Sequence, residues 1–358
     1  MDEEICNPMK ALEREMNEKK ISVIVPCYNV SEFIDRCVQS LADQTIGIED
    51  LECIFVDDAS TDDTLEKLMS WEGKYPESIL VVPCRENHRQ GAARNAGLSY
   101  ATGRYIAFLD SDDYVDPGMY EAMYRKAVDL GCDVVGSFFA RETRDGRQMY
   151  RDETELETEK LVRVDTRAKR KELLVNGLPS GVNTRLYRRE LIFDHDLKFP
   201  EDIRYEDNYW GAILLGMVSS YYIMDACFYH YVVNEASTVM EQNAGHHLDR
   251  LVIELMKVER YKEDGMFREY RDEIEFNFLR LFFINTIRIL FVRFDQIPYQ
   301  IIYDMQGWVR ELFPDYQENP YLDRLPPLQM ELLKIIQVDL TPEKIEVLAQ
   351  GYRSVLKK

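Results

Sequence analysis

Four aspartates follow one apolar segment, "YIAFL" at residues 105–109, in close succession: Asp110, Asp112, Asp113 and Asp116. If the chain stays extended here, the side chains of Asp110 and Asp112 lie on the same side. Two neighbouring carboxylates favour a cation between them, and oxygen ligands in a partly open site suit Mg²⁺ or Mn²⁺ bound together with phosphates. We therefore predict a divalent metal ion at Asp112, with Asp110 beside it. For Asp113 and Asp116 we favour the alternative that they cap the next helix.

A second acidic pair, Asp57 and Asp58 in "VDDAST", also follows an apolar segment. These carboxylates can accept hydrogen bonds from a nucleobase imide or a ribose hydroxyl. For the polar residues that follow, Ser60, Asp62 and Asp63, we favour helix capping. The sequence thus contains one acidic cluster suited to a metal ion and one suited to a nucleoside.

The segment "GAARNAG" places Arg94 in the first turn of a predicted helix. A helix N-terminus attracts anions, and the guanidinium group matches the geometry of a phosphate. The alternative is an arginine that is solvated or paired with a surface carboxylate.

The segment "YED" has Glu206 and Asp207 where a loop meets a helix. A carboxylate at this point can act as a general base if it reaches a cleft, or it can cap the helix. His230 in "CFYHYVV" is either a packed core histidine or a metal ligand, and its aromatic neighbours favour packing.

These residues need elements that position them. Continuous apolar segments that alternate with amphipathic ones predict strands joined by helices, hence an α/β fold with a mostly parallel sheet covered on both faces. Ligands of such sheets bind beyond the carboxyl ends of the strands, where "PCYN", "VDDAST" and "LDSDD" stand. The predicted strands are residues 21–26, 53–58, 79–83, 105–110 and 133–138. The next helix is expected to begin at Asp116 and Pro117.

We predict a polar lead-in at residues 1–20, a catalytic domain at 21–243 and an α-helical region at 244–358. The charged stretch 141–170 is interpreted as an exposed excursion or a loose helix. The segment "FLRLFFINTIRILFVRF" in the last region predicts an amphipathic helix. Such a helix packs into a core or, as the minor alternative, touches a membrane surface or a second copy of the chain.

The composition narrows the function. The chain has 358 residues, 46% of them hydrophobic and 30% charged, and a net charge of -21. This charge argues against binding to nucleic acid and against simple electrostatic docking on an anionic membrane. Without a signal peptide or a long apolar run, we expect a cytoplasmic protein, with a peripheral position at the inner face of the membrane as the alternative. A reducing compartment also fits the seven scattered cysteines, Cys6, Cys27, Cys37, Cys53, Cys84, Cys132 and Cys227.

The order of "VPCYN", "VDDASTDDT", "GAARNAG" and "FLDSDDYVDP" resembles that of the family 2 glycosyltransferases, which have the GT-A fold. The later segments "NTRLYRRELI", "FPEDIRYEDNYW" and "YHYVVNEAST" extend this resemblance to roughly residues 20–240. It implies an inverting transfer of a sugar from a nucleotide-sugar, most often a UDP-sugar, to a hydroxyl of a glycan, lipid-linked or protein-linked acceptor. It also implies Mn²⁺ or Mg²⁺ as the cofactor.

The resemblance assigns roles to individual residues. Asp57 would contact uracil, Asp112 would hold the metal with Asp110, and Asp207, preceded by Glu206, would be the general base. His230 lies where a further metal ligand stands in some related enzymes. The remaining donor-site residues are Pro26, Tyr28, Asn29, Asp58, Arg94 and Ser111.

Other readings explain less of the sequence. A haloacid dehalogenase phosphatase would carry its DxD on the first strand and Thr or Val where Tyr114 stands, and a receiver domain would leave the later segments unexplained. The main alternative is a catalytically inactive nucleotide-sugar-binding or scaffold protein on the same fold. Arg185 in "NTRLYRR" stands where such segments often have lysine, which leaves the acceptor and donor-sugar contacts open.

Overall fold

The computed structural model describes residues 19–143, 148–151, 157–178, 181–233 and 241–356. It divides into two compact units. The first comprises residues 1–170 and 178–234, and the second comprises residues 171–177 and 235–358. Most of the predicted lead-in, residues 1–18, lies outside the described residues.

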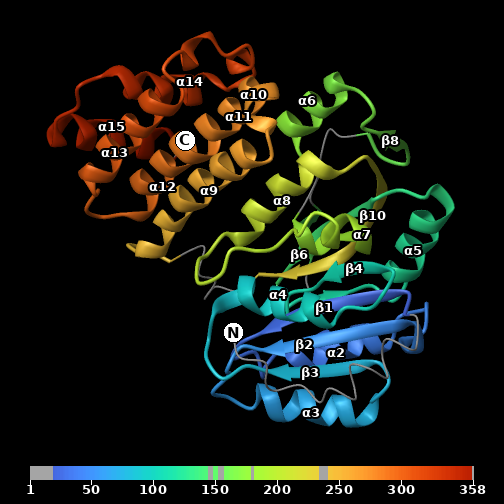
Figure 1. Ribbon diagram of the computed structural model, residues 1–358. Helices are drawn as coiled ribbons and strands as arrows, with labels where there is room; N and C mark the ends of the chain where they lie inside the picture. Colours follow the sequence, from blue (N-terminus) through green and yellow to red (C-terminus); the bar gives the residue numbers. More distant parts are fainter. Residues whose placement is uncertain (1–18, 144–147, 152–156, 179–180, 234–240, 357–358) are drawn as a thin grey trace. The chain divides into compact units, whose positions relative to one another are not determined.

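The N-terminal half of the first unit is a parallel sheet in the order β3-β2-β1-β4 (Figure 1). Every residue of β1, β2 and β4 is buried, as the continuous apolar segments predict. The strands are β1 (Ile21–Cys27), β2 (Leu51–Asp57), β3 (Ile79–Pro83) and β4 (Tyr105–Phe108). The connecting helices are α2 (Ile34–Ala42), α3 (Thr64–Lys74) and α4 (Arg89–Tyr100), with the short η1 (Ile48–Asp50) before β2.

Alternate residues of β1 pack on opposite faces of this sheet. Val23 and Val25 belong to the core cluster that contains the buried side of α2. Ile24 faces α4, where a Cβ added to Gly97 would lie 2.4 Å from its Cγ2 atom. Both faces are therefore covered, and the predicted α/β class is confirmed.

The second half of the sheet is mixed rather than parallel. Strand β9 (Arg185–Arg188) lies between β4 and β6 (Val134–Glu142) and runs antiparallel to both. Strand β10 (Ser220–Val232) pairs in parallel with β6 and antiparallel with β5 (Tyr114–Val115). The mostly parallel sheet expected from the sequence is thus limited to the N-terminal strands, because β9 inserts in the opposite direction.

The stretch 141–170 contains short strands where an exposed excursion or a loose helix was expected. Strand β7 (Gln148–Arg151) pairs with β6, and β8 (Leu161–Arg163) pairs with β10. Helix α6 (Arg167–Asn176) then spans the boundary between the two units. The other elements of the first unit are α5 (Met119–Leu130), η2 (Val182–Thr184), α7 (Arg189–Phe193) and α8 (Glu206–Met217).

Helix α5 begins later than the sequence predicts. Its N-cap is Gly118, and Asp116 lies outside the helix. The carboxylate of Asp116 instead contacts His230, while its carbonyl accepts a hydrogen bond from Gln44 at 2.8 Å. The predicted cap is wrong because a distant histidine engages this aspartate.

The second unit is helical, as predicted for the C-terminal region. The segment 278–294 forms the end of α11, a π-helical stretch η5 and α12, with Phe282, Phe283 and Ile287 buried. Core packing is therefore the correct interpretation of this amphipathic segment. The helices are α9 (Asp249–Glu263), α10 (Met266–Glu269), α11 (Arg271–Phe278), α12 (Thr286–Arg293), α13 (Tyr299–Leu312), α14 (Pro327–Lys334) and α15 (Pro342–Leu356). Between them lie η4 (Gly245–Leu248), η5 (Leu279–Asn285), η6 (Tyr316–Glu318), η7 (Leu322–Arg324) and η8 (Ile335–Gln337).

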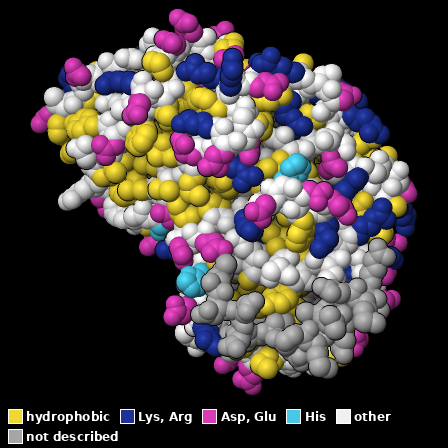
Figure 2. Space-filling view, viewed as in Figure 1, with side chains coloured by type: hydrophobic (Ala, Val, Ile, Leu, Met, Phe, Trp, Pro, Cys, Tyr) yellow, Lys and Arg dark blue, Asp and Glu magenta, His cyan; other side chains and the backbone are white. Residues whose placement is uncertain are grey.

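Apolar side chains also gather on the surface of this helical unit. Figure 2 shows them on the face turned to the viewer. Exposed examples in this unit are Val252, Met256, Val292 and Trp308. No helix in the part of the chain that the structure describes is both long and apolar enough to cross a membrane. Membrane contact or a dimer through these helices stays a prediction.

Candidate active site

The loops after β1 and β2 are joined to each other through Asn29. The residue has a left-handed backbone, with φ of 52°. Its side-chain oxygen accepts a hydrogen bond from the Thr61 amide at 2.8 Å, and its own amide donates to Ser60 Oγ at 3.0 Å. Tyr28 beside it is 48% exposed, whereas Pro26 is buried inside β1. Asn29 thus holds together two of the strand ends that the sequence predicts as donor contacts.

Asp57 presents a buried acceptor at the end of β2. It is 1% exposed, and its Oδ2 accepts a hydrogen bond from the Ser60 amide at 3.2 Å. Its Oδ1 is buried and has no hydrogen-bond partner among the described residues. An unsatisfied buried acceptor is costly, so this oxygen suits a ligand that brings an N–H group.

Asp58 is also buried, but its carboxylate is engaged by the next loop. Its Oδ1 accepts a hydrogen bond from the His88 amide at 2.9 Å. Burial raises the pKa of this carboxyl group, and the backbone hydrogen bonds partly offset that effect. Asp58 therefore fixes the loop before α4 beside the end of β2.

The sequence predicts Arg94 at the start of a helix, yet α4 begins at Arg89 and Arg94 lies in its second turn. Its side chain is 3% exposed. One guanidinium nitrogen contacts Glu206 Oε1 at 2.5 Å and the other contacts Asp110 Oδ1 at 2.9 Å. Burial lowers the pKa of Arg94, but the carboxylates of Asp110, Glu206 and Asp207 outweigh it and raise the pKa overall. Arg94 is thus a buried bridge between Asp110, which follows β4, and Glu206 at the start of α8.

Glycine at position 91 allows this close approach. A Cβ there would lie 2.0 Å from the carbonyl oxygen of Pro200 and 3.3 Å from Cγ of Glu206. Helix α4 therefore packs directly against the segment that leads into α8.

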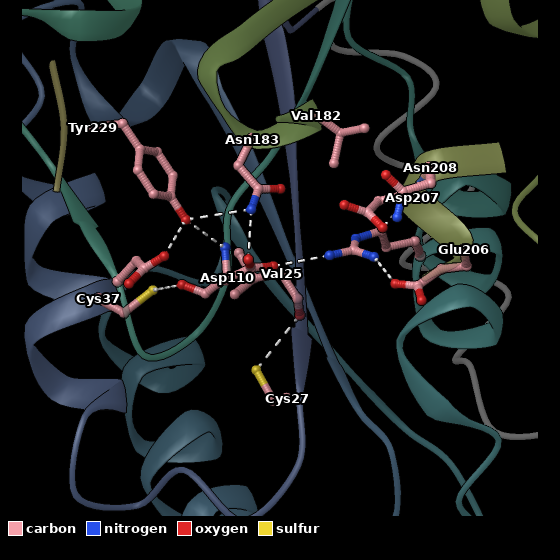
Figure 3. A network of polar contacts seen from close by, with 12 residues as sticks. Val25, Cys27, Cys37, Asp110, Val182, Asn183, Glu206, Asp207, Asn208 and Tyr229 are labelled. Atoms are coloured by element: carbon pink, nitrogen blue, oxygen red, sulfur yellow. Dashed lines mark hydrogen bonds and ion pairs between the residues drawn. The ribbon is translucent and has the colours of Figure 1, made fainter. Parts of the chain in front are cut away.

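Residues 110–113, here called the aspartate loop, form a turn instead of staying extended. The amide of Asp113 donates to the carbonyl of Asp110 at 3.0 Å, so Asp110 and Asp112 do not share one side of an extended strand. Asp110 is held on its other oxygen by Asn183, whose Nδ2 lies 2.5 Å from Oδ2 (Figure 3). The extended chain considered for this segment is therefore not found, and the turn gives each carboxylate different neighbours.

Asp113 is not a helix cap. It is 1% exposed and accepts hydrogen bonds from the Tyr229 hydroxyl at 2.5 Å and the Val232 amide at 2.8 Å. Burial, followed by the nearby Asp112 and Asp110, raises its pKa well above the usual range. Sequence reasoning missed both Tyr229 and Asn183. They stand inside the segments "YHYVVNEAST" and "NTRLYRRELI", which was the available signal.

The other residues of the aspartate loop, Ser111 and Asp112, are compatible with a metal ion that also binds a phosphate. Ser111 is buried, Asp112 is partly exposed, and the Asp112 carbonyl accepts a hydrogen bond from Arg36 Nη2 at 2.9 Å. Within the described residues, no cluster of three or more His, Cys, Asp or Glu side chains could hold a metal ion by itself. Mg²⁺ commonly takes only one or two carboxylates when phosphates supply further ligands, so the donor chemistry of Asp110 and Asp112 fits.

The two carboxylates at the start of α8 have different surroundings. Glu206 is buried against Arg94, and burial raises its pKa although Arg94 lowers it in part. Asp207 is partly exposed, and its Oδ1 accepts the Asn208 amide at 2.9 Å. Figure 3 shows Glu206 and Asp207 side by side on α8. Of the two residues, Asp207 is the more exposed.

His230 is fully engaged by other side chains. Its Nδ1 lies 2.7 Å from Glu142 Oε1 and its Nε2 lies 2.8 Å from Asp116 Oδ1. A metal ion could bind His230 only if one of these contacts broke.

Comparison with known proteins identifies the family of the domain that carries the N-terminal part of this site. The sequence profile described as "Glycosyl transferase family 2" matches residues 22–194. The domain at residues 22–194 belongs to glycosyl transferase family 2. The matched residues carry both aspartate motifs and Arg94, while Asp207 lies beyond them.

Two relatives of this family 2 glycosyltransferase domain show how much of each chain is shared. An uncharacterized glycosyltransferase, EpsJ of Bacillus subtilis (strain 168), is 34% identical over 192 residues, which is 52% of this chain and 53% of EpsJ. The minor teichoic acid biosynthesis protein GgaB of the same organism is 28% identical over 239 residues, 64% of this chain and 25% of GgaB. The chain thus spans about half of EpsJ and a quarter of GgaB.

The fold extends beyond the family domain. A crystal structure of S. aureus TarS 1-349 in complex with UDP-GlcNAc is similar with a TM-score of 0.67 and 20% identity. The match covers 94% of this chain and 92% of that one. It confirms the GT-A fold that the sequence motifs imply and includes the helical C-terminal region.

Proposed function

We propose that this chain transfers a sugar, with inversion, from a UDP-sugar to an acceptor hydroxyl. The observation that carries the proposal is the buried bridge of Arg94, which joins Asp110 on the metal loop to Glu206 beside Asp207. The Arg94 guanidinium group thereby fixes the distance between Asp110, on the donor side of the proposed site, and Glu206, on its acceptor side. Such positioning is what a displacement between two bound substrates requires.

The nucleotide would bind at the ends of β1 and β2. Oδ1 of Asp57 supports this because it is a buried acceptor without a described partner, and it would take the imide N–H of uracil. Tyr28 offers an exposed ring for the base, while Pro26, Asn29 and Asp58 shape the pocket. Arg94 supports the donor indirectly through Asp110, and Ser111 lines the turn.

Asp112, with Asp110 beside it, would hold Mn²⁺ or Mg²⁺ together with the diphosphate. When bound, such an ion neutralises the charge that develops on the leaving diphosphate. His230 is left out of this ligand set because both of its ring nitrogens already contact carboxylates.

Asp207 would accept the proton of the acceptor hydroxyl as that oxygen attacks the anomeric carbon. Glu206 would keep its contact with Arg94 throughout, so the two neighbouring carboxylates have separate tasks. The attack needs no covalent enzyme intermediate, since inversion takes a single displacement.

The acceptor is inferred from the relatives. GgaB is named for minor teichoic acid biosynthesis, which favours a cell-envelope glycan or polymer as the acceptor, lipid-linked or protein-linked. We propose that the protein acts in the cytoplasm or at the inner face of the cell membrane. The net charge of -21 argues against nucleic acid as a partner.

The first experiment is a thermal-shift panel of nucleotides with and without Mn²⁺, because a ligand that binds only the folded state raises the melting temperature. We expect UDP to stabilise the protein more in the presence of Mn²⁺ than in its absence, and one UDP-sugar to be turned over with release of UDP. Binding of UDP without turnover of any UDP-sugar or acceptor would favour the inactive binding protein. Stabilisation by no nucleotide would contradict the proposal.

A further inference from the structure

His230 lies at one end of a series of stacked and hydrogen-bonded side chains. It is the cross-strand partner of Tyr114 in the antiparallel pairing of β10 and β5. The two rings are stacked, with centroids 4.4 Å apart and planes 4° from parallel. Because both ring nitrogens of His230 contact carboxylates, its orientation is fixed from two sides.

Glu142 on β6 holds both stacked rings. Its Oε1 contacts His230 and its Oε2 accepts a hydrogen bond from the Tyr114 hydroxyl. Glu142 is 6% exposed, which places this contact in a nearly dry environment.

Arg36 extends the series to the aspartate loop. The central carbon of its guanidinium group lies 4.8 Å from the centre of the Tyr114 ring. Its Nη2 donates to the carbonyl oxygen of Asp112 at 2.9 Å. Contacts therefore run without a break from Glu142, through His230 and Tyr114, to Arg36 and the backbone of Asp112.

We propose that His230 is a positioning residue of the metal-binding loop, which acts on Asp112 through Tyr114 and Arg36. The inference rests on the proposed function, since it takes Asp112 as the residue that holds the metal. His230 also ties the end of the same loop, at Asp116, to β10. Fixing the loop at these points sets the direction of the Asp112 carboxylate before the metal and the diphosphate bind.

Residues that orient metal ligands typically change metal affinity by about 10- to 100-fold when they are replaced. We expect His230→Phe, which keeps a stacking ring but loses both hydrogen bonds, to weaken Mn²⁺ binding at saturating UDP by about tenfold or more. Arg36→Met should have a similar effect, although a guanidinium group is not itself a metal ligand and contacts only the Asp112 backbone. UDP affinity without metal should not change in either variant.

The measurement is a titration of Mn²⁺ with the full-length protein and UDP, in which electron paramagnetic resonance detects the free ion. Arg125→Met is the matched control, since Arg125 is a largely exposed arginine that pairs with Glu121. Melting temperatures identify a variant that fails to fold, and Tyr114→Phe then replaces it, because it keeps the stack and loses the bond to Glu142. Pulsed electron paramagnetic resonance of the Mn²⁺–UDP complex tests for direct ligation.

A nitrogen coupling from an imidazole that disappears in His230→Phe would show that His230 is a ligand and would overturn the inference. Unchanged Mn²⁺ affinity in Arg36→Met and His230→Phe would also overturn it. If the wild-type protein bound UDP but no Mn²⁺, the metal-assisted function itself would fail, and the inference with it. Weaker Mn²⁺ binding in both variants, without nitrogen coupling in the wild type, is the expected result.

Discussion

Arg94 donates a hydrogen bond to Glu206 inside the protein, and neither side chain is more than 7% exposed. Removing one partner of such a pair leaves a buried charge without compensation. We therefore expect Arg94→Met to lower the free energy of unfolding by about 3–5 kcal/mol, measured by urea denaturation. Arg125→Met, which breaks an exposed pair, should cost no more than about 1 kcal/mol. Equal effects of the two substitutions would contradict the bridge.

Asp207→Asn tests the general base. Loss of a positioned base should lower kcat by about 10²- to 10⁴-fold, while the affinity for UDP stays the same. Steady-state kinetics with the donor identified by thermal shift, together with UDP titration, separate the two effects. Asp194→Asn removes the same charge from an exposed site in the first unit and serves as the control. Loss of UDP binding in Asp207→Asn would assign the residue to the donor pocket.

Asp112→Asn tests the metal site. In the wild-type protein, UDP at 100 times its Kd should stabilise the fold by about 2.7 kcal/mol. The part of this effect that requires Mn²⁺ should disappear in Asp112→Asn, as read from melting temperatures with and without the metal. Asp63→Asn, at an exposed aspartate before α3, should behave like the wild type. A full metal effect in Asp112→Asn would place the ion elsewhere.

Gly91→Ala tests the packing of α4 against the approach to α8. Since the added Cβ would lie 2.0 Å from the Pro200 carbonyl, the backbone must shift. We expect a loss of about 1–3 kcal/mol in the free energy of unfolding and a lower kcat, because the Glu206 segment moves. Gly73→Ala in α3 meets no atom within 4 Å and should instead stabilise the protein by up to about 1 kcal/mol. The opposite order would refute this packing argument.

Cys84 gives a pH-dependent probe of the donor pocket. Burial, then Asp58 and Asp57, raises its pKa to about 11, so the thiol is protonated at neutral pH. Because the thiolate is the reactive form, alkylation by iodoacetamide should rise about tenfold per pH unit from pH 7 to 9. Mass spectrometry of the Cys84 peptide measures this rate, and bound UDP should slow it. A rate that levels off below pH 9 would contradict the raised pKa.

The strands of the N-terminal half could be predicted because β1 and β2 are continuous β-branched and apolar segments with polar ends. Strand β9 could not be, because its few residues, Arg185–Arg188, carry a mixed pattern and owe their structure to pairing with β4 and β6. The direction of β9 is equally a tertiary property. Local sequence was thus sufficient to predict the strands that are buried on both faces of the sheet.

The candidate site shows the same division. Asp110, Asp112 and Asp113 look alike in sequence, and distant partners separate their roles. Tyr229, 116 residues further along the chain, donates a hydrogen bond to Asp113. The sequence around Asp113 does not predict this contact. Glu206 and Asp207 are likewise adjacent, and the sequence alone does not distinguish them. In the structure, Arg94 forms an ion pair with Glu206. Roles in the acidic motifs still stand as predictions that the experiments above address.

The place of β9 in the sheet bears on how the protein is made. This strand lies between β4 and β6, yet both of them precede it in the chain. While the ribosome is still extending the chain, β4 and β6 each keep an open edge until residue 188 has emerged. Such non-local pairing closes slowly, and exposed strand edges attract other nascent chains. We therefore expect the unfinished protein to depend on chaperones until β9 pairs with β4 and β6 and completes the sheet.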